Sequence, residues 1–496
     1  MKKFYGFFVL FVGTIFSKAA GFFREILFSA YFGTGETATA FKIAQTAYLL
    51  PVQALVGDTL SAGLLPLYNK LEFSQNRQKI LILSATIYAL ILSLLLSFLI
   101  FTFSKSIVIF IAPGSSVSVL DLASSLLCVL SLSLPFYILG GTLSFIETAY
   151  GFYSGIAFRP ILINIFSILG ILLTVYFGYE FFLALLILLA HFLFLIITIY
   201  KLCKIGNILS FKNIELNILK EVFLSFIKNM YPLLGLPIIV QTSVICERII
   251  SSKLGVGVIP SVDYARILCE TLVQLIAVPL GIITMSQFGG KSILGIMEFS
   301  KTIIKILIFL ITPISLFFYQ NSFHIIKFIY GRGAFNDESI SLTSTVFQWM
   351  GLALVATVIS YFLIKTLNAM LENKAALFIT LVAVIFSILI NFTFWNMIGI
   401  HAIGISVLSY SVVILLMSSI YLKISRYVLS CFIMIFPLII FQYFFNKWFI
   451  EIFSGNIIIF CLILFIFWCL FYFMDPLMRG LFFNFLKNNK RYFLKK

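Results

Sequence analysis

Long apolar runs recur along the whole chain and limit the folds open to it. About 20 consecutive apolar residues cross the hydrocarbon core of a bilayer as a helix, and an early run reads "FYGFFVLFVGTIF". Of the 496 residues, 62% are hydrophobic and only 10% are charged, whereas a soluble domain carries about 25% charged residues. The sequence therefore predicts an all-α polytopic membrane protein.

The N-terminus resembles a signal peptide, with Lys2 and Lys3, an apolar core and "SKAA" as a cleavage site. The apolar character resumes after this stretch, and no segment downstream resembles a secreted soluble domain. We therefore interpret the N-terminus as an uncleaved first span.

Runs bounded by polar residues, Gly or Pro give roughly fourteen spans in all, at about 5–30, 39–67, 80–112, 121–149, 157–178, 181–201, 219–250, 260–288, 300–330, 340–370, 375–397, 400–422, 428–447 and 455–479.

The loops between these spans alternate in charge. One set is basic and contains Lys2, Lys3, Lys70, Arg77, Lys79, Arg159, Lys201, Lys204, Lys212, Lys220, Lys291, Lys301, Lys374, Lys423, Arg426 and the tail from Arg479. In the other set the basic residues are Lys253, Arg332 and Lys447. Basic loops accumulate on the cytoplasmic side. We therefore expect a multi-pass membrane protein with both termini cytoplasmic, and we attribute the net charge of +16 to topology rather than to nucleic-acid binding.

The longest inner loop divides the chain into two helical halves. It covers 201–218, between an N-terminal lobe at 1–200 and a C-terminal lobe at 219–427. Two extra helices at 428–480 and a basic tail at 481–496 follow. Two bundles around a central cavity are typical of secondary transporters.

Several charged residues fall inside the predicted spans, where an ionised side chain costs at least about 2.5–3.5 kcal/mol. They are Lys18, Arg24, Glu25, Lys42, Asp58, Glu147, Glu247, Arg248, Arg266, Glu270 and Lys365. We assign Lys18, Arg24 and Arg266 to the cavity as ligands of an anionic substrate, since they lie in spans one and eight. Glu25, Glu270 and Asp58 would position these cations or couple transport to an ion. For Lys42, Glu247 and Arg248, ion pairs between packed helices are an equal alternative.

A basic cavity between apolar helices suits an amphiphilic anion such as a polyprenyl diphosphate. A cation-coupled drug exporter would need an acidic cavity instead. A membrane glycosyltransferase would need paired acidic residues, and the sequence has no DxD motif. It also lacks a Walker-type loop, which excludes an ATPase within this chain. We therefore expect a transporter rather than an enzyme, driven by a Na⁺ or H⁺ gradient, the membrane potential or metabolic pull on its product. The scattered cysteines and three histidines indicate no metal site or other cofactor.

The stretch "SKAAGFFREILFSAYFGTGETATAFKIA" resembles the start of the MurJ/MviN family, the bacterial lipid II flippases of the MOP exporter superfamily. That family opens with S-R-x-x-G-x-x-R-(D/E), then F-G-x-G and A-F. Similar segments follow in order over about residues 10–425: "GDTLSAGLLPLYNK", "APG" at Ala112–Gly114, "LPF" at Leu134–Phe136, "FRPILINI", "YA" with Glu270, and "YGRGAF" at Tyr330–Phe335.

This resemblance implies a fourteen-helix inner-membrane fold with two six-helix lobes and a C-terminal lipid groove. It implies a monomer that flips an undecaprenyl-diphosphate-linked glycan to the periplasm for peptidoglycan synthesis, with membrane lipids around it and no nucleic acid. Lys18 stands where the family usually has Arg, and Arg24 matches. The sequence departs from the family at four other positions, which keeps O-antigen or exopolysaccharide repeat units open as substrates: Thr39, Val52, Gln53 and Ile267, the last directly after Arg266.

Overall fold

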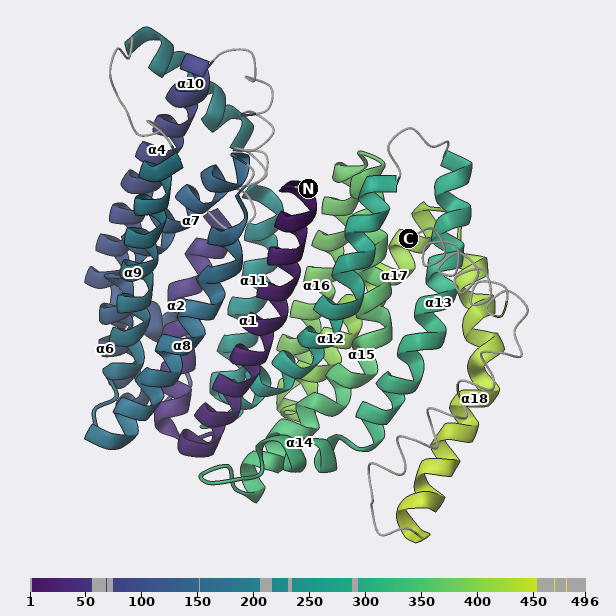
Figure 1. Cartoon of the computed structure of the whole chain (residues 1–496). Coiled ribbons are helices and arrows are strands. Elements are labelled where there is room, and N and C mark those ends of the chain that lie inside the picture. Colours follow the sequence, from purple (N-terminus) through teal and green to yellow (C-terminus); the bar gives the residue numbers. More distant parts are fainter. Residues whose placement is uncertain are drawn as a thin grey trace, which may run out of the picture. The chain divides into compact units, whose positions relative to one another are not determined.

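The computed structural model describes residues 2–55, 68, 75–150, 152–205, 216–230, 234–287, 293–452, 468 and 479. Within these residues the chain forms helices joined by short turns (Figure 1). They fall into two compact units: residues 1–267, 326–343 and 387–403 form the first, and 268–325, 344–386 and 404–496 form the second. The predicted lobes at 1–200 and 219–427 remain a prediction.

The first unit contains ten complete helices among the described residues: α1 (Lys2–Phe32), α2 (Glu36–Leu55), α4 (Gln75–Thr102), α5 (Ser104–Ile111), α6 (Val117–Ser131), α7 (Leu134–Ala149), α8 (Ser154–Phe177), α9 (Phe182–Ile205), α10 (Leu216–Met230) and α11 (Gly235–Lys253). Helix α8 packs between α1 and α9, while α7 packs against α4 and α9. Helix α12 (Val258–Gln287) begins in this unit. The packing places α1, α2 and α8 around one interior, where the charged residues of α1 lie.

The other helices of the described chain are α13 (Ile293–Gln320), α14 (Ser322–Tyr330), α15 (Asp337–Ala369), α16 (Asn373–Ile398), α17 (His401–Tyr421) and α18 (Ser425–Ile452). In the second unit, side-chain bonds to backbone carbonyls join neighbouring helices. Ser315 of α13 donates to the Gly351 oxygen of α15 at 2.7 Å, and Ser360 of α15 donates to the Ser411 oxygen of α17 at 2.7 Å. Lipid would offer these hydroxyl groups no hydrogen-bond partner, and the neighbouring helices supply one.

Each of the first thirteen predicted spans coincides with one helix or two. The span predicted at 219–250 comprises α10 and α11, and that at 300–330 comprises α13 and the short α14. The predicted span at 455–479 lies outside the described residues apart from Trp468 and Arg479. Within the described chain, eight helices are long and apolar enough to cross a membrane, or nine if α6 and α7, bent by 45°, form one span.

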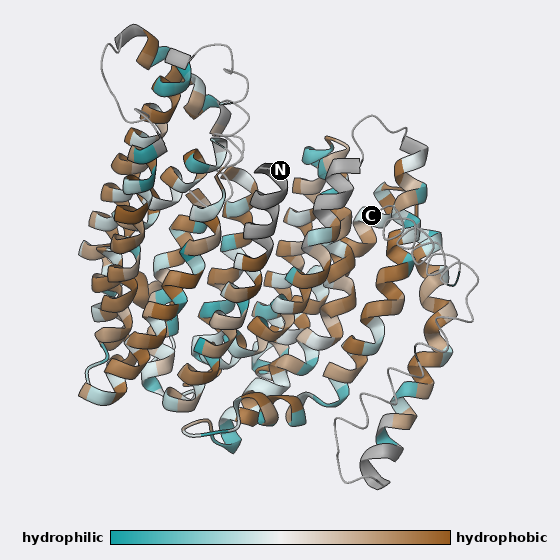
Figure 2. Ribbon diagram, in the orientation of Figure 1, coloured by the Kyte–Doolittle hydropathy of each residue, from teal (hydrophilic) through white to brown (hydrophobic). Residues whose placement is uncertain are grey.

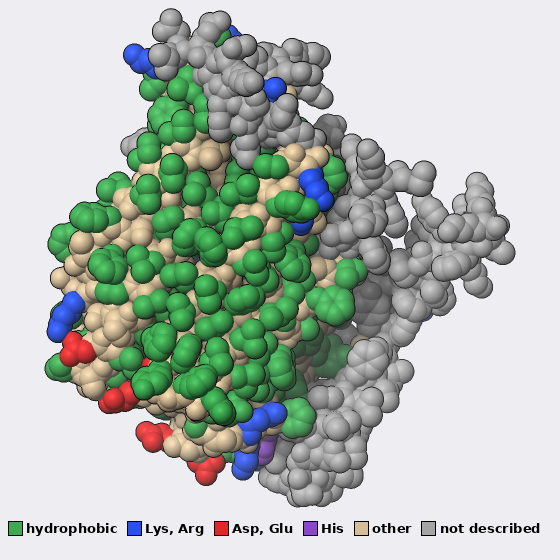
Figure 3. Space-filling view, turned by 60° about the vertical axis from the view of Figure 1, so that its left-hand side comes forward, with side chains coloured by type: hydrophobic (Ala, Val, Ile, Leu, Met, Phe, Trp, Pro, Cys, Tyr) green, Lys and Arg blue, Asp and Glu red, His purple; other side chains and the backbone are tan. Residues whose placement is uncertain are grey.

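The surface agrees with a lipid environment. Figure 2 shows hydrophobic residues along the middle of the helices, and Figure 3 shows a face on which hydrophobic side chains cover the middle while charged ones lie toward its two ends. Exposed side chains of this kind occur on α4, α8 and α9, among them Leu94, Leu95, Phe98, Ile165, Leu169, Leu172, Leu189, Phe192 and Ile196. Apolar side chains in these positions suit contact with acyl chains rather than water.

Glycine makes a close approach possible at the turn between α1 and α2. Gly33 has φ +55° and Gly333 has φ +61°, both in the left-handed region that glycine tolerates. The Ala334 N–H donates to the Ala30 oxygen at 2.7 Å, and a Cβ on Gly333 would lie 2.1 Å from that same oxygen. Tyr264 of α12 donates its hydroxyl to the Gly33 oxygen at 2.8 Å. The "FGTG" and "YGRGAF" segments, far apart in sequence, therefore lie against each other.

Candidate functional site

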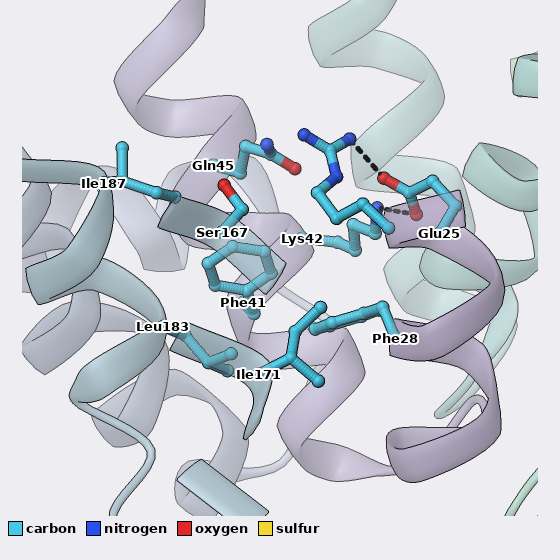
Figure 4. A pocket seen from close by; sticks show the side chains of 10 residues that line it. Glu25, Phe28, Phe41, Lys42, Gln45, Ser167, Ile171, Leu183 and Ile187 are labelled. Carbon is cyan, nitrogen blue, oxygen red and sulfur yellow. Dashed lines mark hydrogen bonds and ion pairs between the residues drawn. The ribbon is translucent and has the colours of Figure 1, made fainter. Parts of the chain in front are cut away.

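The site centres on Glu25, a carboxylate of α1 that is only 2% exposed. Its Oε1 accepts a bond from the Arg24 guanidinium at 2.5 Å, and its Oε2 accepts one from the Lys42 ammonium of α2 at 2.9 Å (Figure 4). Burial of a lone carboxylate among apolar helices would cost several kcal/mol. The two cations compensate this cost. The positioning role of Glu25 stays a prediction, and the structure places its carboxylate against Arg24.

Lys42 is a packed counter-ion rather than an open ligand. It is 3% exposed, and its Nζ lies 5.2 Å from the Phe28 ring centroid and 5.6 Å from that of Tyr264. Aromatic faces attract a cation at such distances. The contacts of Lys42 therefore favour an ion pair between packed helices over a role as a ligand in the cavity.

Arg24 is oriented by a second helix. Its Nη1 donates to Oδ1 of Asn164, on α8, at 3.0 Å, and the Asn164 amide donates to the Ser17 carbonyl of α1 at 3.0 Å. The Arg24 side chain keeps 22% of its surface exposed. Arg24, Lys42 and Glu25 carry two positive charges and one negative charge, so this cluster has a net charge of +1. Its surplus cation is the partly exposed guanidinium of Arg24.

A small pocket lies beside this cluster, and its walls differ in character (Figure 4). Polar side chains line one part of it: Arg24, Glu25, Lys42, Gln45 and Ser167. Apolar side chains line the rest: Phe28, Phe41, Ile171, Leu183 and Ile187. The pocket therefore joins a cationic surface to an apolar one.

The charges of α11 and α12 form two ion pairs. Nη2 of Arg266 contacts both carboxylate oxygens of Glu247, at 2.6 and 2.5 Å. Arg248 pairs with Asp263 and donates to the Ile259 carbonyl at 3.3 Å. Two cations meet two carboxylates here, so these four residues are balanced in charge. Arg266 is thus engaged by Glu247 of the neighbouring helix, a partner that its spacing to Glu270 did not indicate.

The other predicted site residues are more dispersed. Lys18 is half-buried on α1, nearly two turns before Arg24. Glu270 is exposed on α12, one turn after Arg266. Asp58 lies outside the described residues. The structure thus brings Arg24 and Glu25 together and leaves the roles assigned to Lys18, Glu270 and Asp58 as predictions.

Sequence reasoning missed Asn164, Asp263 and Tyr264, which all contact the charged residues. Asn164 is a polar side chain inside an apolar run, and such residues commonly bond other helices. Asp263 lies three positions before Arg266, on the same face of the helix. The sequence alone could therefore have indicated Asn164 and Asp263. It could not have indicated Tyr264, because aromatic residues are common in membrane spans.

These features define a class: a polytopic helical transporter with buried, paired charges within its helices. The model of the family "Lipid II flippase MurJ" matches residues 28–483. The chain therefore belongs to the MurJ family of lipid II flippases, as the sequence motifs predicted, and this is a family of transporters rather than enzymes.

Curated relatives are similar to this chain over most of their length. A "Probable lipid II flippase MurJ" of Buchnera aphidicola subsp. Acyrthosiphon pisum (strain APS) is 26% identical over 400 residues, which cover 76% of this chain and 75% of the relative. The protein of the same description from Buchnera aphidicola subsp. Schizaphis graminum (strain Sg) is 24% identical over 477 residues, covering 90% and 91%.

Solved structures support the same fold. A "Lipid II flippase MurJ, inward closed conformation" is similar with a TM-score of 0.77 at 21% identity, covering 94% of this chain and 99% of that one. A multidrug resistance MATE family transporter of the MOP superfamily, in an inward-facing conformation, is similar with a TM-score of 0.67 at 13% identity, covering 84% and 95%. The fold is therefore shared by a lipid II flippase and a MATE family transporter.

Proposed function

We propose that this protein flips an undecaprenyl-diphosphate-linked glycan, lipid II, from the cytoplasmic to the periplasmic leaflet by alternating access. Membership in the MurJ family supports this substrate. The observation that carries it is the +1 cluster, in which the partly exposed Arg24 is oriented by Asn164 and Glu25. A guanidinium offers a fork of N–H donors that fits a phosphate.

The charge of the cluster argues against the drug exporters that share the fold. A cation-coupled drug exporter would need an acidic cavity, whereas a cavity with a surplus positive charge would repel a cationic drug. A related substrate is a second candidate. Gln53, where the family often has a basic residue, accepts a bond from Gln241 of α11 at 3.0 Å. Such a neutral amide pair favours the hydroxyl groups of another lipid-linked glycan, such as an O-antigen or exopolysaccharide repeat unit.

We place the protein in the inner membrane of a bacterium with both termini in the cytoplasm, because the basic loops would then all face inward. It acts as a monomer among membrane lipids, without nucleic acid or a bound cofactor. A Na⁺ or H⁺ gradient or the membrane potential drives the cycle. The segment 428–480 would receive the lipid tail.

Complementation tests this function. Cells depleted of their own lipid II flippase should regrow when this chain is expressed, and should not regrow with Arg24→Ala at equal protein level. Lys105→Ala, which removes an exposed cation paired with Asp121 away from the cluster, serves as the matched control. Absence of growth with the wild-type chain, together with restored synthesis of a surface polysaccharide in a strain lacking that flippase, would favour the second candidate.

A further inference from the structure

Glu147 is a second buried carboxylate, outside the cluster around Glu25. It lies in the last turn of α7 and is 1% exposed. Helices α6 and α7 together are long and apolar enough to cross a membrane, and the described part of that span reaches Thr148. Acidic residues in such positions are expensive and usually have a function.

The surroundings of Glu147 come from two other helices. Ser154, the first residue of α8, donates its hydroxyl to Oε1 at 2.9 Å. That hydroxyl accepts a bond from the Lys201 ammonium of α9 at 3.2 Å. In the part of the chain that the structure describes, no ion pair within 4.0 Å joins Glu147 to a basic side chain. Lys201 is therefore held one hydroxyl group away from the carboxylate.

The second carboxylate oxygen, Oε2, is buried and has no hydrogen-bond partner among the described residues. It lies against Gly155, where a Cβ would be 2.2 Å from it. Glycine at this position lets the carboxylate oxygen approach the backbone of α8 closely, and any other residue would clash with it.

Other charged and titratable groups nearby are already engaged. The Arg159 guanidinium of α8 lies 4.0 Å from the Tyr137 ring centroid and donates to the Tyr137 carbonyl at 3.0 Å. Helix α4 also packs on α7, and among described residues it brings no basic side chain within ion-pair distance of Glu147. A buried carboxylate without a direct counter-charge is costly. Its environment therefore favours a positive ligand.

We propose that Glu147 binds a monovalent cation, a proton or a sodium ion, at Oε2, and that Lys201 competes with this cation for the carboxylate. When the cation leaves, the ammonium replaces the Ser154 hydroxyl and pairs directly with Glu147. When the cation binds, Lys201 returns to Ser154, and the end of α9 is released from α7. Both states keep the buried carboxylate compensated.

This site is also connected to the cluster on α1. Gly155 and Asn164 lie on α8 about 14 Å apart along the helix axis, and Asn164 orients Arg24. A shift of the start of α8 on cation binding would therefore reach Arg24. This coupling role rests on the proposed function, whereas the binding site itself does not.

Thermal unfolding of the purified full-length protein tests the site, because a ligand of the folded state raises its Tm. Sodium chloride is compared with choline chloride at fixed ionic strength, over a series of pH values. If the ligand is sodium, NaCl raises the Tm of the wild type. If it is a proton, only acidification does so. In either case Glu147→Gln and Gly155→Ala abolish the response, while Glu221→Gln, an exposed carboxylate on α10, retains it.

Lys201→Met provides an independent measurement if the first two variants fail to fold. Without the competing ammonium, the Tm should rise at a cation concentration at least about tenfold lower than in the wild type. Identical responses of wild type and Glu147→Gln to both cations, or identical midpoints of wild type and Lys201→Met, would overturn the proposal and leave Glu147 as a packing residue. Failed complementation with intact cation binding would refute the flippase function and not this site.

Discussion

Arg24 of α1 and Asn164 of α8 are 140 positions apart in the chain and are joined by a hydrogen bond of 3.0 Å. The same amide holds the Ser17 carbonyl at 3.0 Å, so one side chain fixes both the helix and the guanidinium. Arginine has five N–H donors, and Asn164 and Glu25 each accept one of them. The guanidinium is thus oriented before a ligand arrives, which reduces the entropic cost of binding.

Asn164→Leu should weaken binding of a diphosphate lipid, because Arg24 loses an orienting acceptor. Asn164→Asp keeps the acceptor but removes the surplus charge of the cluster, so it should bind weakly although Arg24 stays oriented. Ile165→Ala, at an exposed position of the same helix that does not line the pocket, is the matched control. Affinity of the purified variants for an undecaprenyl diphosphate provides the measurement. Wild-type affinity in Asn164→Leu would contradict the positioning role.

Glu25→Gln should destabilise the fold by about 3–5 kcal/mol, because it leaves the buried Lys42 ammonium without its carboxylate. Lys42→Met in the same chain should recover much of this loss, since both charges are then absent. A double-mutant cycle on the free energy of unfolding measures the coupling. If the two single effects simply add, Lys42 and Glu25 do not act as a pair.

Gly333→Ala should destabilise the contact between the α1–α2 turn and the "YGRGAF" segment. The cost combines left-handed backbone strain, about 1–2 kcal/mol, with a clash against the Ala30 oxygen, 2.1 Å from the added Cβ. Gly178→Ala is a control, because its φ of +75° is also left-handed while nothing lies within 4 Å of its Cβ. The difference in Tm between the two variants isolates the clash. Equal values would show that the two segments do not need this close approach.

Single cysteines in a cysteine-free background test the predicted orientation. A cysteine at Ser116, the N-cap of α6, should react with an impermeant reagent from outside the cell. A cysteine at Lys220, on α10, should react only after the cells are opened. The opposite pattern, or equal labelling at both positions, would contradict the assignment of basic loops to the cytoplasm.

Much of the fold followed from local features of the sequence. Apolar runs of membrane length located the helices. That 219–250 contains parts of two helices, α10 and α11, was missed because both carry apolar residues. The contact of Arg24 with Glu25 agrees with their closeness in sequence. The pairs of Lys42 with Glu25, and of Arg266 with Glu247, were not predictable, because those partners lie on different helices. Neither spacing nor periodicity within one helix specifies which charges of its neighbours it meets.

Transport by the purified protein in lipid vesicles tests the central claim most directly. Movement of a labelled undecaprenyl-diphosphate glycan between leaflets is followed for wild type, Arg24→Ala, Arg24→Lys and Lys18→Arg. Arg24→Ala should abolish movement while the protein still inserts and folds. Arg24→Lys should retain only part of it, because an ammonium lacks the guanidinium fork. Lys18→Arg should be tolerated. Movement at the wild-type rate with Arg24→Ala would contradict the account and show that the charges of α1 serve only its packing.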